Sequence, residues 1–170
     1  MQSEFSAEQW ISALHLLPHP EGGFYSEVYR ANTNIPHSAL PPHYSGSRSL
    51  ATSIYFLLKS NQRSHFHRLR SDELWYFHAG SAIVVHVIAP NGTLTTITLG
   101  TEVDDGQQLC CIIPAEHWFS AIVEEEHSYG LVSCVVAPGF DFADFELAER
   151  KNFAVLFPQH KELIFSFTKE

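Results

Sequence analysis

The sequence predicts an all-β domain, a sandwich or a barrel, with a helix at its start and helices at its end. Short segments rich in Val, Ile, Thr, Tyr and Phe follow one another from residue 53 to residue 140, and turn residues separate them. Helical spacing of apolar residues occurs only near the two ends of the chain. A chain of 170 residues can bury a core of its own. We therefore expect one domain over residues 1–170, with the barrel at roughly 22–140 and a helical tail at roughly 141–170.

The first element is a predicted helix from Ser6 to Leu17. Ser6 and Gln9 stand three residues apart, as in a capping box, and Pro18 ends the helical pattern. The prolines and glycines of "PHPEGG" then predict a turn.

A strand is predicted next, over "FYSEVYR" at residues 24–30. Phe24 and Val28 alternate with Tyr25 and Tyr29, so that both faces of this strand carry apolar side chains. A strand that is apolar on both faces suits a sheet that packs across a partner. We therefore expect a homodimer with this strand region in its interface.

A long loop is predicted at residues 31–48, which contain three prolines and no periodicity; such a loop can form a flap over a site. The predicted strands after it are "SIYFLLK", "SHFHRL", "ELWYFHAG", "AIVVHVIA", "LTTITLG", "QLCCIIP", "HWFSAIV" and "YGLVSCVVAPGF". The tripeptide "PNG" between the fourth and fifth of these is a hairpin signal. In the tail, Asp141 or Asp144 can cap a helix whose apolar side includes Phe145 and Phe153, and Pro158 interrupts it.

The overall charge argues against a nucleic-acid partner. The formal net charge is −9, with ten Lys and Arg residues, and such a chain repels a phosphate backbone. Three cysteines, two of them adjacent, do not form a disulfide framework and indicate a reducing compartment. No apolar run is long enough to span a membrane, and the first residues lack the features of a signal peptide. We expect a cytoplasmic protein without a membrane partner.

The strongest candidate site is the stretch "HFHRLRSDELWYFHAG". His65 and His67 alternate in an extended strand and should point the same way, and Glu73, Trp75 and Phe77 should share a face after the next turn. Two imidazoles and a carboxylate on one wall of a barrel can line a pocket. The same set can hold a divalent metal ion.

These residues resemble the first motif of the cupin superfamily, an H-x-H pair followed by Glu and, seven residues later, Gly. The sequence departs from that motif at Lys59, which stands in place of the leading glycine, and in the five residues between His67 and Glu73. The second cupin motif aligns on "PAEHWF", where Phe119 replaces the metal-binding histidine and His117 lies two residues earlier. Over almost the whole chain, "HPEGGFYSEVYR", "TSIYFLL", "APGFDFADFEL" and "FPQHKELI" resemble the small fifth cupin family. This resemblance implies a cupin-type jelly-roll (double-stranded β-helix) barrel, commonly dimeric, whose reaction is unknown.

The resemblance does not favour a bound metal or another cofactor, because the third histidine is missing. If a metal is present, the resemblance implies His65, His67 and Glu73 as ligands of Fe, Mn, Ni or Zn, with His117 as a substitute for the absent histidine.

The preferred function is a cupin that binds a small molecule: a sugar, a nucleotide or a sugar-nucleotide phosphate. Epimerase or isomerase chemistry is expected if it is an enzyme, with His65, His67 and Glu73 as catalytic groups. The arginines near the histidines suggest a phosphate contact. The predicted ligand-binding residues are Arg48, Tyr55, His65, His67, Glu73, Trp75, Phe77 and His117. His19 is expected at the surface, and Glu21 in a turn or at a cavity rim. The alternatives are a metal-dependent oxygenase or isomerase and a non-catalytic binding or storage protein.

Overall fold

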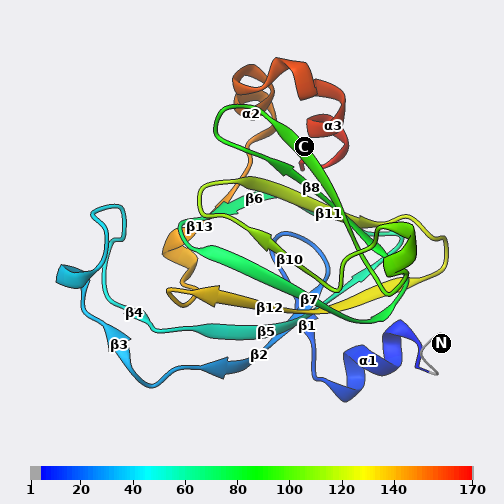
Figure 1. Ribbon diagram of the computed structural model, residues 1–170, viewed down its shortest axis with the longest axis horizontal. Helices are drawn as coiled ribbons and strands as arrows, with labels where there is room; N and C mark the ends of the chain where they lie inside the picture. The colour runs from blue at the N-terminus through cyan, green and yellow to red at the C-terminus, as the bar shows by residue number, and fades with distance from the viewer. Residues whose placement is uncertain (1–4, 170) are drawn as a thin grey trace.

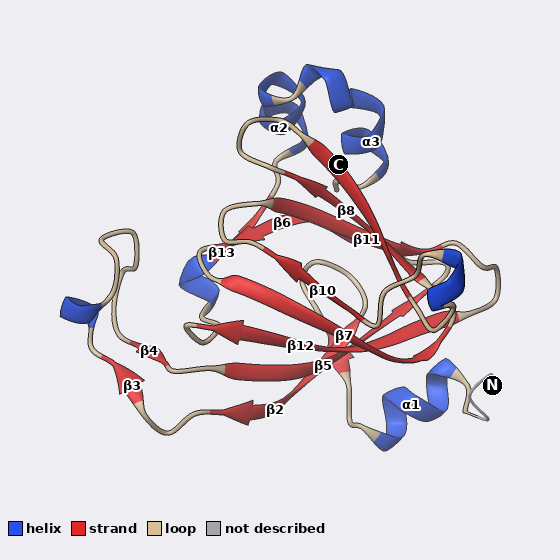
Figure 2. Cartoon of the chain, viewed as in Figure 1, coloured by secondary structure: helices blue, strands red, loops and turns tan. Residues whose placement is uncertain are grey.

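Two antiparallel sheets form the barrel in the computed structural model, which describes residues 5–169 (Figures 1 and 2). The six-stranded sheet has the order β1 (Leu17–Pro18), β2 (Phe24–Arg30), β5 (Thr52–Lys59), β12 (Tyr129–Ala137), β7 (Asp72–Gly80) and β10 (Cys110–Ile113). The five-stranded sheet has the order β13 (Phe145–Leu147), β6 (Ser64–Leu69), β11 (Trp118–Val123), β8 (Ile83–Ile88) and β9 (Leu94–Leu99). The expected all-β barrel with helices at both ends is confirmed.

Helices cover the outer faces of both sheets (Figure 1). Helices α2 (Arg150–Leu156) and α3 (Lys161–Ser166) pack on the five-stranded sheet, where Phe66 and Trp118 meet Phe153 and Phe167. Helix α1 (Ala7–Ala13) lies against the six-stranded sheet. The inner faces of the two sheets pack against each other in the main apolar core. A cavity between the sheets would therefore lie in the interior of the barrel.

The N-terminal helix begins as predicted but ends earlier. The Ser6 side chain accepts a hydrogen bond from the Gln9 backbone, and the Gln9 side chain accepts one from the Ser6 backbone. The helix stops at Ala13 because His15 adopts a positive φ of 52°. Leu17–Pro18 then pairs with β2 as an edge strand, so the expected helix to Leu17 is wrong in its last turn.

The C-terminal helix begins later than predicted. Asp141 caps only a 3₁₀ turn (Phe142–Asp144), and Phe145–Leu147 forms strand β13 on the edge of β6. Glu149 is the N-cap of α2. The sheet therefore extends to Leu147, beyond the expected boundary near residue 140, because pairing with β6 outweighs the helical spacing of this segment.

Residues 31–48 contain regular secondary structure, although the sequence predicted a long loop there. They contain strand β3 (Asn34–Ile35), which pairs with β4 (Arg48–Ser49), and a 3₁₀ turn at His37–Ala39. A further 3₁₀ turn lies at Val103–Asp105 and another at Pro158–His160.

Within residues 5–169, no helix has the length and apolar character needed to cross a membrane.

Candidate functional site

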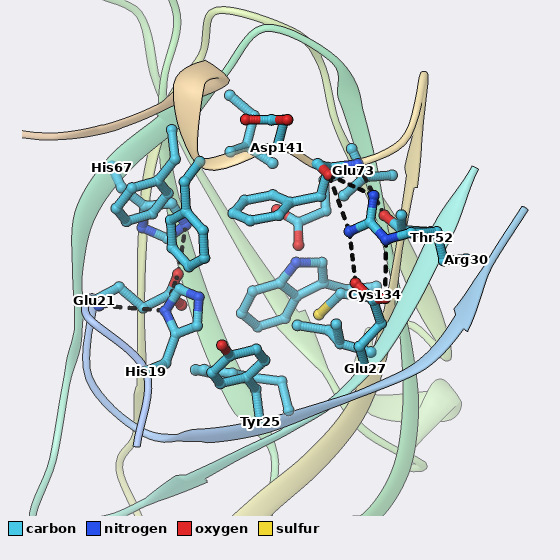
Figure 3. A pocket seen from close by; sticks show the side chains of 18 residues that line it. His19, Glu21, Tyr25, Glu27, Arg30, Thr52, His67, Glu73, Cys134 and Asp141 are labelled. Atoms are coloured by element: carbon cyan, nitrogen blue, oxygen red, sulfur yellow. Dashed lines mark hydrogen bonds and ion pairs between the residues drawn. The ribbon is translucent and has the colours of Figure 1, made fainter. Parts of the chain in front are cut away.

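A cavity of about 360 Å³ lies between the two sheets. Its walls come from β2, β5, β12 and β7 on one side, from β6 and β13 on the other, and from the turns before β2 and after β12. Six aromatic residues line it: Tyr25, Phe56, Trp75, Phe140, Phe142 and Phe145. The charged or titratable residues of its wall are His19, Glu21, Glu27, Arg30, His67, Glu73, Cys134 and Asp141 (Figure 3).

Glu21 is the centre of a buried polar network on one side of the cavity (Figure 3). Its Oε2 lies 3.1 Å from His67 Nε2 and 3.2 Å from His19 Nδ1, and its Oε1 accepts a hydrogen bond of 2.7 Å from the Ser64 hydroxyl. Burial alone would raise the pKa of this carboxyl group, but the charges and hydrogen bonds of His67, His19 and Ser64 outweigh burial and lower the pKa below its ordinary value. Glu21 is therefore a carboxylate at neutral pH.

His67 is held from both ring nitrogens. Its Nδ1 lies 2.7 Å from the backbone oxygen of His65, and its Nε2 faces Glu21. Burial lowers the pKa of His67, whereas the negative charge of Glu21 and the hydrogen bond to the His65 backbone oxygen act in the opposite direction. The side chain is 3% exposed and also lies against the Phe119 ring, with 4.0 Å between ring centroids. His67 thus lines the cavity as predicted.

A β-bulge moves His65 out of the cavity, which corrects the expectation that His65 and His67 line it together. In the pairing of β6 with β11, Ser64 and His67 oppose Ala121 and Phe119, so β6 carries one extra residue between them. Ser64 and His67 therefore reach the same carboxylate. The backbone nitrogen of His65 and its Nδ1 lie 2.8 Å and 2.6 Å from the Glu21 backbone oxygen. His65 anchors the Glu21 turn instead of lining the cavity.

His19, which the sequence placed at the surface, is part of the site. Its side chain is 6% exposed, and its ring packs at a right angle to the Tyr25 ring, with 4.7 Å between centroids. The only sequence signal was the alternation of His19 and Glu21 immediately before a strand. Pro20 and the two glycines after Glu21 masked that signal by indicating a turn.

Glycines allow this turn to approach the barrel closely. Gly22 has a φ of +112°, and a Cβ atom there would lie 2.1 Å from the backbone oxygen of Arg63. This contact brings Glu21 against the start of β6, where Ser64 and His67 reach it.

Glu73 occupies a different part of the wall and lacks the partners that Glu21 has. It is 7% exposed, and within residues 5–169 its Oε2 has no hydrogen-bond partner. Burial, and next the negative charge of Glu21, raise its pKa to about 8, although the nearby Trp75 indole and Cys134 thiol act in the opposite direction. Trp75 lines the same wall, as predicted, and within the same residues its Nε1 also lacks a hydrogen-bond partner.

The mouth of the cavity is marked by a more exposed ion pair. Arg30 Nη2 lies 2.6 Å from Glu27 Oε2, and the two side chains are 44% and 40% exposed. The guanidinium also donates to the backbone oxygen of Phe140. A bulge in β2 after Glu27 brings Arg30 to the cavity side and leaves Tyr29 exposed, so the simple alternation expected for Tyr25, Glu27 and Tyr29 ends at Glu27.

Besides His65, four residues predicted to bind a ligand do not line the cavity. Tyr55 lies between the cavity residues Ile54 and Phe56, so alternation directs it to the outer face near α1. Phe77 packs against the main core without reaching the cavity, and His117 lies in the turn before β11, with Nδ1 3.1 Å from the Ala115 backbone oxygen.

Arg48 is the fourth, and its charge is neutralised elsewhere. It donates from Nε and Nη2 to the two carboxylate oxygens of Asp144 at 2.6 Å and 2.7 Å, and both residues are buried. Arg68 pairs with Glu146, outside the cavity. The expected group of arginines beside the histidines is therefore not part of the cavity wall.

The donor set does not fit a cupin metal centre. His65 is outside the cavity, both nitrogens of His67 face protein oxygens, and Phe119 occupies the position of the third histidine. Residues 5–169 contain no group of three His, Cys, Asp or Glu side chains with the geometry to hold a metal ion. No step of the chemistry below involves a metal.

A family profile described as "Cupin superfamily (DUF985)" matches residues 8–148. An uncharacterized protein of Saccharomyces cerevisiae is 27% identical in an alignment of 148 residues, and the match covers 82% of this chain and 73% of the yeast protein.

Two solved structures are similar over nearly their full lengths. A protein of Shewanella oneidensis is 39% identical, with a TM-score of 0.86, and the match covers 97% of this chain and 98% of that one. A hypothetical protein of Leishmania major is 35% identical, with a TM-score of 0.89, and the match covers 98% and 100% of the two chains. An oxalate decarboxylase of Bacillus subtilis shares the fold alone, at 19% identity and a TM-score of 0.55, over 100% of this chain and 41% of that chain.

Proposed function

The chain belongs to the DUF985 family of the cupin superfamily, and from that premise we propose that it binds a small organic molecule in the cavity between the sheets and transfers protons on it. The observation that carries this proposal is Glu73: a nearly fully buried carboxyl group whose Oε2 lacks a hydrogen-bond partner within residues 5–169, in an otherwise largely aromatic cavity. Buried polar groups almost always have partners, so an unpartnered one that lines a cavity indicates a ligand.

The proton-transfer group in this proposal is His19, oriented by Glu21. His19 Nδ1 lies 3.2 Å from Glu21 Oε2, and it also accepts a 3.3 Å hydrogen bond from the Glu21 backbone N–H, which requires the lone pair of a neutral ring on Nδ1. The proposed proton transfer requires the other tautomer, in which Nδ1–H donates to Oε2 in place of the backbone contact and the lone pair is on Nε2, which no residue in the described part of the chain hydrogen-bonds. The ionised Glu21 stabilises the imidazolium that forms when Nε2 takes a proton. Epimerisation or isomerisation next to a carbonyl group requires a base of this kind, which removes a proton from carbon and returns it to the same or a neighbouring carbon.

The cavity supports some of the expected ligands better than others. A sugar-like ring fits walls of aromatic side chains, which pack against the C–H faces of such rings. A phosphate-bearing nucleotide is less well supported, because Arg48 and Arg68 are outside the cavity and Arg30 is paired with Glu27. We therefore propose a ligand without a phosphate group.

Hydrogen exchange tests the proposal. The protein is incubated in D₂O with a panel of aldoses, ketoses and amino sugars, and NMR follows the loss of carbon-bound hydrogen. We expect exchange in at least one compound, lost in His19→Gln and retained in Glu162→Gln, which changes an exposed carboxylate on α3. If a compound binds but its carbon-bound hydrogen does not exchange, the proposed proton transfer is wrong and only ligand binding remains. If no compound binds and none exchanges hydrogen, the proposal is contradicted.

A further inference from the structure

The cavity wall has an excess of acidic groups. Glu21, Glu27, Glu73 and Asp141 line it, and among the described residues Arg30 is the one Lys or Arg of the wall. Arg30 forms a two-point ion pair with Glu27, with 2.9 Å from Nε to Oε1 and 2.6 Å from Nη2 to Oε2. Glu21 and Glu73, which lie deeper, have no Lys or Arg partner among residues 5–169. The interior therefore repels anions and attracts cations.

Glu73 and Trp75 supply a more specific feature. The carboxyl group of Glu73 is buried and its Oε2 has no hydrogen-bond partner in the described chain, which is unfavourable for a carboxylate. The Trp75 indole N–H is close enough to favour the charged form of Glu73, but within residues 5–169 it does not meet the geometry of a hydrogen bond to that or any other group. A positively charged group next to Glu73 would complete the surroundings of a stable carboxylate.

The remaining wall is suited to a charged organic group rather than to a hydrated metal ion. Tyr25, Phe56, Trp75, Phe140, Phe142 and Phe145 surround the space. The rings of Phe56 and Trp75 lie 5.6 Å apart between centroids, and the rings of Phe140, Phe142 and Phe145 contact one another in a second group. The faces of aromatic rings attract organic cations, most strongly where water is excluded.

We infer that the cavity recognises a small organic cation, an amine or methylated ammonium group carried on a molecule of about one ring, with its charge next to Glu73 and its carbon atoms against the aromatic wall. This inference rests on the proposed function, in that it names the ligand class of the same cavity. The amino group of the ligand would be the missing partner of the Glu73 carboxylate. The His19–Glu21 pair would remain available for proton transfer on a neighbouring carbon of the ligand.

Three probes of one shape and different charge test the inference: benzylammonium, benzyl alcohol and benzoate. Isothermal titration calorimetry at pH 8 measures each Kd with the full-length protein. We expect benzylammonium to bind about tenfold tighter than benzyl alcohol and benzoate to bind most weakly. Glu73→Gln keeps the shape of the side chain and should remove this preference by weakening benzylammonium alone. Glu162→Gln makes the same change in net charge at an exposed position and should leave all three affinities unchanged.

The outcomes separate the inference from the proposed function. Equal affinity for benzylammonium and benzyl alcohol would overturn the inference and leave a neutral-ligand cavity, and tightest binding of benzoate would overturn it in favour of an anion. Binding of none of the three would count against the inference and also against the cavity as a site for one-ring molecules. The ranking of the probes on the unsubstituted protein decides these cases even if Glu73→Gln does not fold.

Discussion

Replacement of Glu73 by Gln should stabilise the protein at alkaline pH and have a much smaller effect at pH 5. Burial and the charge of Glu21 raise the pKa of this carboxyl group from an ordinary 4.5 to about 8. Below pH 4.5 the group is protonated in the folded and unfolded states and contributes no pH dependence. Between pH 4.5 and pH 8 the unfolded chain loses the proton while the folded protein keeps it. The free energy of unfolding therefore falls as pH rises through this range.

The size of the effect follows from the two pKa values. Each unit of pKa difference corresponds to about 1.4 kcal/mol, and the part of the shift that is expressed between pH 5 and pH 8 amounts to about 3.5 kcal/mol. A buried Gln has an energetic cost of its own, but that cost does not depend on pH. The change in the free energy of unfolding between the two pH values isolates the titration of Glu73.

Urea denaturation of the unsubstituted protein, Glu73→Gln and the matched control Glu162→Gln measures this difference at pH 5 and pH 8. Relative to the other two proteins, Glu73→Gln should gain about 3 to 4 kcal/mol when the pH is raised from 5 to 8. Equal stability differences at both pH values would show that Glu73 is ionised in the folded protein without cost, and would refute the reasoning. A confirmed gain would mean that the protein retains a destabilising buried carboxyl group, which is typical of a functional site.

Further predictions concern other parts of the structure. Arg48→Met should cost about 3–5 kcal/mol, because it leaves the buried carboxylate of Asp144 with only its longer, 3.9 Å contact to Arg70. The double variant Arg48→Met/Asp144→Asn should recover part of that loss in the same denaturation assay, and no recovery would contradict the assignment. Gly22→Ala should destabilise by more than Gly106→Ala, because both glycines have positive φ but a Cβ at Gly106 meets nothing within 4 Å; equal losses in Tm would argue against the close approach. Metal analysis of protein purified without chelator should find no stoichiometric Fe, Mn, Ni or Zn that resists dialysis, because the donor set does not fit, and a retained metal would refute this. Light scattering should show a homodimer that Tyr29→Lys weakens, since Tyr29 is 56% exposed; a monomer at micromolar concentration would disprove it.

The sequence by itself predicted the barrel, the order of its strands along the chain and one wall of the site. Alternation within a strand is a local property, and it correctly placed Glu73 and Trp75 on the same inward face. The capping box at Ser6 is equally local and was predicted in full. The resemblance to the cupin motifs also identified His67 and the Phe119 that lies against it.

Only the tertiary structure decided which polar groups meet. The β6 bulge, which removes His65 from the cavity and turns Ser64 toward Glu21, depends on the register with β11 and leaves no local pattern in the sequence. Arg48 pairs with a residue 96 positions away, and no spacing rule predicts that contact. Glu21 joins His67 because the glycine turn packs against the start of β6, so the centre of the site depends on an approach between distant segments. Such an approach is set by packing and sheet pairing rather than by local periodicity.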